Sequence, residues 1–253
     1  TLLSFQNSLP PVVGRLAALI VGIILLNGFL FHKALWRAGL GRKRNRKTKT
    51  IPAVLVTVFS EALSPECRDL FVETLTPLYQ RLGPTVIDLH VIPFGGSELQ
   101  TTESGTLAVS CPHGPAECDL HTYEQCVILS QYPDPMRYLG FVNCLYKRIS
   151  SDSTENERLR GVAKCAKRHD LSFTTFASCH DDPNIAVVLQ RKASSLTPEE
   201  VTSVPWLEVS GERVIVPSDN TWETSLEELV CRKYMDGGGR HRHCNAYLRD
   251  KDS

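Results

Sequence analysis

The hydrophobic pattern is uneven, and its longest apolar run lies near the start of the chain. Residues 16–31 contain one polar side chain, Asn27, and with their flanks they reach the roughly 20 residues that span a bilayer. The pattern predicts a transmembrane helix over residues 12–36, after a tail of residues 1–11, with Trp36 at the membrane interface. A cleaved signal peptide and a buried globular helix are the alternatives.

Positive charge is concentrated directly after this run. Eight Lys or Arg residues and no acid lie between Lys33 and Lys49, although the whole chain has 28 basic and 28 acidic residues. Residues 37–50 are therefore predicted to form a basic linker that lies near anionic lipid headgroups. The positive-inside rule places this linker on the cytoplasmic side, whereas the cysteines described below favour the opposite side, so the orientation stays open.

Shorter apolar runs after the linker predict alternating strands and helices. Residues 53–59 are β-branched and apolar, which is typical of a buried strand. Ser64 and Pro65 are a typical N-cap and first helical residue, and apolar positions at helical spacing continue to Gly83. Residues 85–92 predict a second strand. Strand, helix and strand in this order form a βαβ unit with parallel strands.

The rest of the chain predicts a helical insertion followed by a hairpin and a last helix. Residues 123–190 have a mostly helical pattern, residues 204–216 predict a hairpin entered through Pro205, and residues 225–234 predict the final helix. We therefore expect an α/β thioredoxin-like domain over residues 51–248. A helical, disulfide-rich insertion separates its two halves, and the transmembrane helix precedes it.

Nine cysteines are more than expected in a cytosolic chain of 253 residues. Their spacing favours disulfides in an oxidising compartment over buried free thiols, and it does not fit a zinc knuckle. The odd count leaves one thiol over, for which Cys67 is the candidate. From proximity along the chain we expect bridges between Cys231 and Cys244 and between Cys165 and Cys179.

Residues 111–126 carry the most specific motif, Cys-Pro-His-Gly-Pro-Ala-Glu-Cys-Asp-Leu-His-Thr-Tyr-Glu-Gln-Cys. It resembles the signature of the gamma-interferon-inducible lysosomal thiol reductase (GILT) family, with Pro112 and His121 in place of a Gln and an Asn. The resemblance covers roughly residues 52–244. Further similar segments are Ile92-Pro-Phe-Gly95, Phe141-Val-Asn-Cys144, Val204-Pro-Trp-Leu-Glu-Val-Ser-Gly211 and Leu229-Val-Cys-Arg-Lys-Tyr234.

The resemblance implies a thioredoxin-like fold in an oxidising or acidic compartment, and reduction of protein disulfides by a Cys-x-x-Cys pair. Here Ser64 stands at the attacking position and Cys67 at the resolving position. Pro205 corresponds to the proline that is cis in such folds and lies against the active-site thiols. The remaining cysteines are disulfide candidates: Cys111, Cys118, Cys126, Cys144, Cys165, Cys179, Cys231 and Cys244.

Three functions remain open after the loss of the attacking thiol. The favoured hypothesis is a membrane-anchored accessory or structural subunit of a membrane protein assembly, without dithiol reductase activity. The alternatives are a membrane-tethered oxidoreductase that uses Cys67 as a single thiol, and a separate redox pair among Cys111, Cys118 and Cys126. Membrane lipids and membrane proteins are the expected partners, and no cofactor, metal or nucleic acid is predicted. The mitochondrial intermembrane space, the thylakoid lumen and the endolysosomal or endoplasmic reticulum lumen all fit.

Overall fold

The chain divides into two units, residues 1–50 and 51–253, and the computed structural model describes the second. The described ranges are residues 51–101, 107–215 and 222–251. The predicted tail, the transmembrane helix over residues 12–36 and the basic linker lie outside these ranges. Within them, every helix is too short or too polar to cross a membrane.

The first half of the fold is the predicted βαβ unit. Strand β1 (Val54–Ser60) runs parallel to β2 (Ile87–Pro93), and three helical segments connect them: α2 (Pro65–Asp69), the π-helical η1 (Leu70–Leu75) and α3 (Thr76–Leu82). Sequence periodicity predicted one continuous helix here. Pro77 has no N–H to donate to the carbonyl of Glu73, so the regular ladder is interrupted one turn before the proline.

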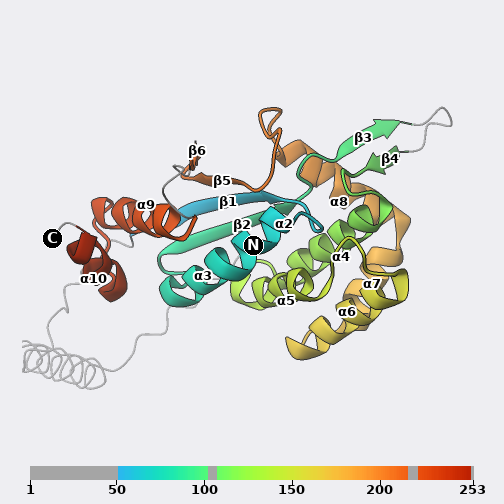
Figure 1. Cartoon of the computed structure of the whole chain (residues 1–253), viewed down its shortest axis with the longest axis horizontal. Coiled ribbons are helices and arrows are strands. Elements are labelled where there is room, and N and C mark those ends of the chain that lie inside the picture. The colour runs from blue at the N-terminus through green and yellow to red at the C-terminus, as the bar shows by residue number, and fades with distance from the viewer. Residues whose placement is uncertain (1–50, 102–106, 216–221, 252–253) are drawn as a thin grey trace, which may run out of the picture. The chain divides into compact units, whose positions relative to one another are not determined.

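The second half adds two antiparallel strands to the same sheet. Strand β5 (Trp206–Val209) pairs with β1, and β6 (Glu212–Arg213) pairs with β5, which gives the order β2-β1-β5-β6 (Figure 1). The Val204–Pro205 peptide bond that leads into β5 is cis. The predicted buried strand is present, with Val54, Val56 and Val58 buried, but Leu55 is 37% exposed. One face of β1 is covered, and the opposite face is open at this end.

The insertion begins with a hairpin that the sequence pattern did not reveal. Strands β3 (Glu98–Thr101) and β4 (Leu107–Ser110) are antiparallel and form a separate two-stranded sheet. The helices that follow are α4 (Pro115–Gln131), α5 (Pro135–Arg148), α6 (Glu155–Arg168), α7 (Phe173–Asp181) and α8 (Pro183–Leu196). The helical region therefore starts eight residues before the predicted position, at the proline that follows Gly114.

The C-terminal region contains two helices where one was predicted. The predicted helix over residues 225–234 lies within α9 (Trp222–Asp236), and α10 (Arg242–Lys251) follows the glycine-rich turn. Both helices lie at one end of the molecule, beside the ends of β1 and α3 (Figure 1).

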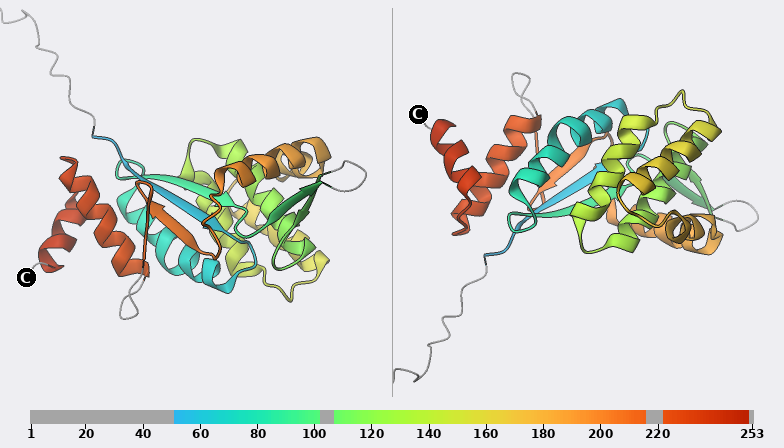
Figure 2. Two further views of the ribbon diagram at one scale, coloured as in Figure 1. Left: turned by 90° about the horizontal axis from the view of Figure 1, so that it is seen from above. Right: turned by 90° about the horizontal axis from the view of Figure 1, so that it is seen from below.

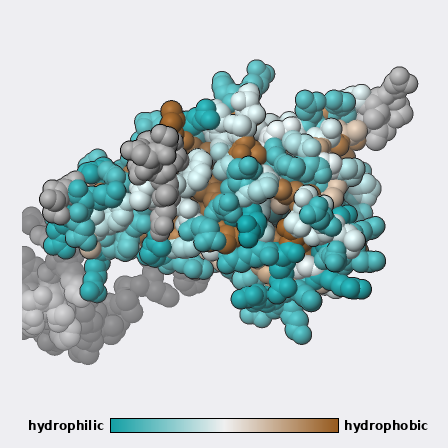
Figure 3. All heavy atoms as spheres, viewed as in Figure 1, coloured by the Kyte–Doolittle hydropathy of each residue, from teal (hydrophilic) through white to brown (hydrophobic). Residues whose placement is uncertain are grey.

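The main core lies between the sheet and the helices that cover one of its faces. Figure 2 shows the first helix and α5 against that face, and the stacked rings of Phe71 and Tyr146 join them with centroids 4.8 Å apart. A second apolar cluster around Phe59 and Trp206 packs against α8 on the opposite face of the sheet. On the face drawn in Figure 3 the surface is mainly hydrophilic, with small separate hydrophobic patches.

Four disulfides connect the helices and the turn before α4. They join Cys111 to Cys118, Cys126 to Cys179, Cys144 to Cys165, and Cys231 to Cys244, and Cys67 is the free thiol. The Cys231–Cys244 pairing agrees with the expectation. The expected pairing of Cys165 with Cys179 was wrong, since α6 packs beside α5 and α7 packs beside α4.

The disulfides differ in the length of chain they enclose, which predicts an order of stabilisation. Cys126–Cys179 spans 53 residues and Cys231–Cys244 spans 13. The chain-entropy model assigns about 4 kcal/mol to the longer loop and about 3 kcal/mol to the shorter one. We therefore expect the double alanine variant of Cys126 and Cys179 to be the less stable in equilibrium urea unfolding. The reverse order would show that helix packing, and not loop length, determines these contributions.

Candidate functional site

The N-terminus of the first helix is the place where a thioredoxin-like reductase carries its thiols, and here a serine caps it. The extended backbone of Ser64 (φ −69°, ψ 125°) lets its hydroxyl accept a hydrogen bond from the N–H of Cys67 at 3.2 Å. The same hydroxyl donates to Glu66 Oε2 at 3.0 Å. Both hydrogen bonds are local, so the Ser64 hydroxyl acts as a helix cap, and the Glu66 carboxylate to which it donates is too weak a base to make it a nucleophile toward sulfur.

Cys67 lies one turn further into the helix and is fully buried. Its Sγ accepts a weak hydrogen bond from the N–H of Glu61 at 3.5 Å. Burial, far more than the nearby carboxylates of Glu61 and Glu124, raises the pKa of the Cys67 thiol to about 12. The thiolate that performs disulfide exchange is therefore almost absent at neutral pH.

One face of α4 packs against the loop between β1 and α2 and presents polar groups to it. Glu117, His121 and Glu124 are spaced four and three residues apart, so they share this face. The N–H of Leu63 donates to Glu117 Oε1 at 3.0 Å, and the N–H of Ala62 donates to His121 Nε2 at 3.1 Å. The two side chains thus hold the loop that leads into the first helix.

The buried groups on this face differ in charge. Burial lowers the pKa of His121 to about 4, so its ring is neutral and, with Nε2 accepting, carries its proton on Nδ1. That nitrogen lies 3.9 Å from Cys111 Sγ. Burial and, second, the charge of Glu117 raise the pKa of Glu124 to about 8, so this carboxyl is largely protonated at neutral pH.

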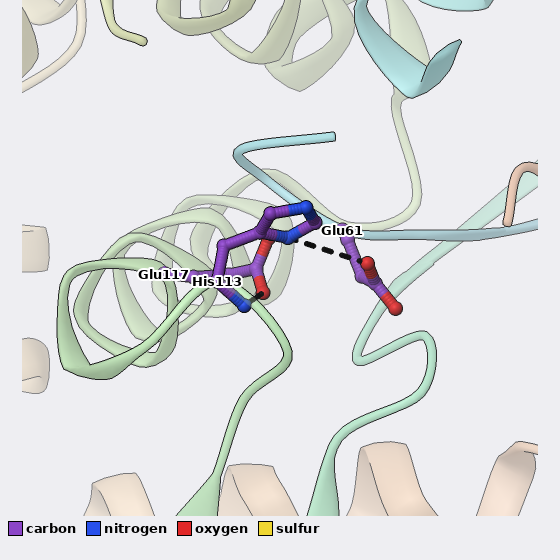
Figure 4. A group of neighbouring side chains, drawn as sticks. All are labelled: Glu61, His113 and Glu117. Atoms are coloured by element: carbon purple, nitrogen blue, oxygen red, sulfur yellow. Dashed lines mark hydrogen bonds and ion pairs between the residues drawn. The ribbon is translucent and has the colours of Figure 1, made fainter. Parts of the chain in front are cut away.

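His113 lies beside Glu117 at the start of α4, and Glu61 faces them from the loop after β1 (Figure 4). His113 Nδ1 lies 2.9 Å from Glu117 Oε1 and 3.5 Å from Glu61 Oε2, and its backbone N–H donates to Glu117 Oε2 at 3.0 Å. Burial raises the pKa of Glu61, although a hydrogen bond from the Gly96 N–H opposes this effect. The three ligand-type atoms of Glu61, His113 and Glu117 lie within 4.8 Å of one another.

The structure brings together some of the predicted residues and separates others. Ser64 and Cys67 share one helical turn. The Cys111–Cys118 disulfide lies near His121, whose Nδ1 is 3.9 Å from Cys111 Sγ, and Ser97 donates to Cys111 Sγ at 3.3 Å. The other three disulfides join helices of the insertion and the C-terminal pair. Cys126 is paired with Cys179, so Cys126 is not available to form a redox pair with Cys111 or Cys118.

Sequence reasoning missed Glu61, and it did not assign Glu117 and Glu124 a role. The spacing of His113 and Glu117 within the signature was a usable signal, because residues four apart are neighbours at a helix start. Glu61 gave no signal, since it lies 52 residues before His113 and reaches it only through the fold.

The known proteins that this chain is similar to agree with the family that its motif indicates. Residues 55–169 match the family model described as gamma interferon inducible lysosomal thiol reductase (GILT). The chain is 26% identical over 197 residues to a gamma-interferon-responsive lysosomal thiol protein of Arabidopsis thaliana, which covers 76% of each chain. It is 30% identical over 198 residues to a GILT-like protein of Caenorhabditis elegans, covering 78% of this chain and 56% of that relative.

Solved structures resemble the chain in fold at low identity. BdbD from Bacillus subtilis superposes with a TM-score of 0.52 at 14% identity, covering 75% of this chain and 90% of that one. MdbA, a thiol-disulfide oxidoreductase from Actinomyces oris, gives a TM-score of 0.50 at 18% identity, covering 70% and 80%. The fold is thus thioredoxin-like with a helical insertion. The match of residues 55–169 to the family model and the relatives in plants and animals, not the fold alone, show that the chain belongs to the GILT family.

Proposed function

We propose that this chain is a GILT-family domain without dithiol reductase activity that serves as a membrane-anchored accessory subunit of a protein assembly. The observation that carries this proposal is the state of the helix N-terminus. Ser64 replaces the attacking thiol and its hydroxyl caps the helix, while the one remaining thiol, Cys67, is fully buried.

Neither step of dithiol disulfide reduction can proceed at this site. The first step needs an exposed thiolate at the helix N-terminus, and a serine hydroxyl without a strong base cannot attack sulfur. The second step needs a thiol that resolves the mixed disulfide. Without the first thiol no mixed disulfide forms, so Cys67 has no substrate to resolve. A single-thiol activity of Cys67 would require exposure and a lowered pKa, which are the opposite of what its environment provides.

The proposed compartment and anchor rest on different features. Four disulfides fit an oxidising compartment. The apolar residues 12–36 are long enough to span a bilayer, and the basic residues that follow fit contact with anionic lipids. A domain that keeps its fold, has lost its nucleophile and is held at a membrane fits a binding role better than turnover of diffusing substrates.

Cys67 should resist thiol reagents in the native protein. A pKa of about 12 leaves roughly a thousandth of the thiolate of an ordinary cysteine at pH 8, and burial also blocks access. We expect labelling by iodoacetamide, followed by mass spectrometry, to require denaturation without reductant. Cys67→Ser provides the unlabelled reference. Stoichiometric labelling of the native chain would instead show that this thiol is accessible and would support the single-thiol alternative.

The wild-type chain should reduce insulin disulfides no faster than the background rate with dithiothreitol. We expect Ser64→Cys to raise the rate above wild type, because a thiol at the N-cap faces the free N–H groups of the helix start and lies one turn from Cys67. Cys67→Ser should remain at background. Wild-type activity that disappears in Cys67→Ser would contradict the proposed loss of catalysis.

The full chain should fractionate with membranes and remain there in high salt, because apolar insertion does not depend on ionic strength whereas the basic residues alone would be released. A chain lacking residues 12–36 should appear in the soluble fraction.

After extraction in mild detergent, size-exclusion chromatography with mass spectrometry should find the native protein in a stoichiometric complex. A solitary monomer in the extract would argue against the accessory role.

A further inference from the structure

Three side chains from three segments converge beside the capped helix. Glu61 follows β1, His113 lies in the turn after β4, and Glu117 lies in the first turn of α4. His113 Nδ1 stands between the carboxylates, 2.9 Å from Glu117 Oε1 and 3.5 Å from Glu61 Oε2 (Figure 4). The arrangement thus places one imidazole nitrogen and two carboxylate oxygens within 4.8 Å of one another.

Backbone amides hold both carboxylates in this orientation. Glu61 Oε1 accepts from the Gly96 N–H at 2.7 Å, and Glu117 accepts from the N–H groups of Leu63 and His113. Gly95 is required for the first contact, because a Cβ there would lie 2.4 Å from Glu61 Cγ. Hydrogen bonds that fix ligand orientation in this way are a feature of metal sites, and they leave lone pairs of both carboxylates facing His113.

The charge of the site is poorly compensated by the protein. Glu61 and Glu117 are buried, and each has His113 as its ion-pair partner among the residues that the structure describes. Buried carboxylates are normally paired with cations or coordinate metals, so this region lacks positive charge.

We infer that Glu61, His113 and Glu117 form a binding site for a divalent transition-metal cation of the zinc class. One imidazole nitrogen with two carboxylate oxygens is a ligand set that Zn²⁺ accepts. Zinc bonds of about 2.0–2.2 Å in tetrahedral geometry separate ligand atoms by about 3.3 Å, which lies between the two measured distances from His113 Nδ1. His113 is 35% exposed, which provides a path for the ion and room for a water as fourth ligand.

A second histidine of the domain, His180, has the same kinds of partner as His113 in a different geometry. His180 also has two carboxylate partners, but Nε2 contacts Asp119 at 2.7 Å and Nδ1 contacts Asp181 at 2.8 Å. The two carboxylates lie on opposite sides of the ring, so they cannot bind one ion together with either nitrogen. His180 therefore provides a matched control of the same composition in a different arrangement.

The inferred ion would connect the β1–α2 loop to the turn before α4. Glu61 lies three residues before the Ser64 cap, and the Cys111–Cys118 disulfide closes the turn that contains His113. A metal ion bound here would stabilise the N-terminus of the first helix by holding Glu61 in place, at the position where a reductase of this fold carries its thiols. The inference goes beyond the accessory role proposed above and does not depend on it.

The test is Zn²⁺ binding to the untagged, oxidised full chain in detergent, by isothermal titration calorimetry and by metal analysis after dialysis. We expect one Zn²⁺ per chain at this site. Changing an outer-shell group of a metal site costs about 10–100-fold in affinity, so removal of a ligand in His113→Gln should weaken binding by at least that factor. Glu61→Gln, which keeps an acceptor for the Gly96 N–H, should have a similar effect.

His180→Gln should bind Zn²⁺ with wild-type affinity and stoichiometry. Circular dichroism and thermal unfolding without metal establish that each variant is folded, and the half-exposed His113 makes His113→Gln informative even if Glu61→Gln does not fold. No binding by the wild type, or equal binding by wild type and His113→Gln, would overturn the inference and leave His113 as a hydrogen-bonding bridge between two carboxylates.

Discussion

The docking of α4 onto the β1–α2 loop is the contact on which the rest of the site depends. The N–H groups of Ala62 and Leu63 have no partner within a strand or helix, and buried amides without partners cost about 1–3 kcal/mol each. His121 and Glu117 satisfy them through hydrogen bonds of 3.1 and 3.0 Å. The same contact sets the position of the Ser64 cap, because the cap directly follows this loop.

The surroundings of this contact keep Cys67 inert and place His113. Cys67 lies one turn beyond the loop and is fully buried, whereas Pro65 and Glu66 at the helix start are exposed. The Cys111–Cys118 disulfide then holds the turn before α4, so that His113 reaches the carboxylates of Glu61 and Glu117. In a reductase of this fold, the helix start and the turn before α4 would surround a reactive thiol. In this chain they surround the buried thiol of Cys67.

Local patterns predicted those parts of the fold that local forces determine. The βαβ unit, the serine cap and the Cys231–Cys244 bridge depend on residues near each other in sequence, and each is present. The open face at Leu55 and the pairing of Cys126 with Cys179 depend on which helix lies against which strand or helix, and no short-range pattern encodes that arrangement. Glu61 belongs to the second group, because its function follows from a meeting of distant segments.

The three buried carboxylates near the helix start show how the charge of this site is compensated. At Glu124 a proton does so, because burial raises the pKa of that group to about 8. Glu61 and Glu117 instead face one imidazole, and a single positive charge at most can arise there without another cation. The pKa of Glu61 is raised by burial, so protons compete with a metal for this carboxylate more strongly as the pH falls.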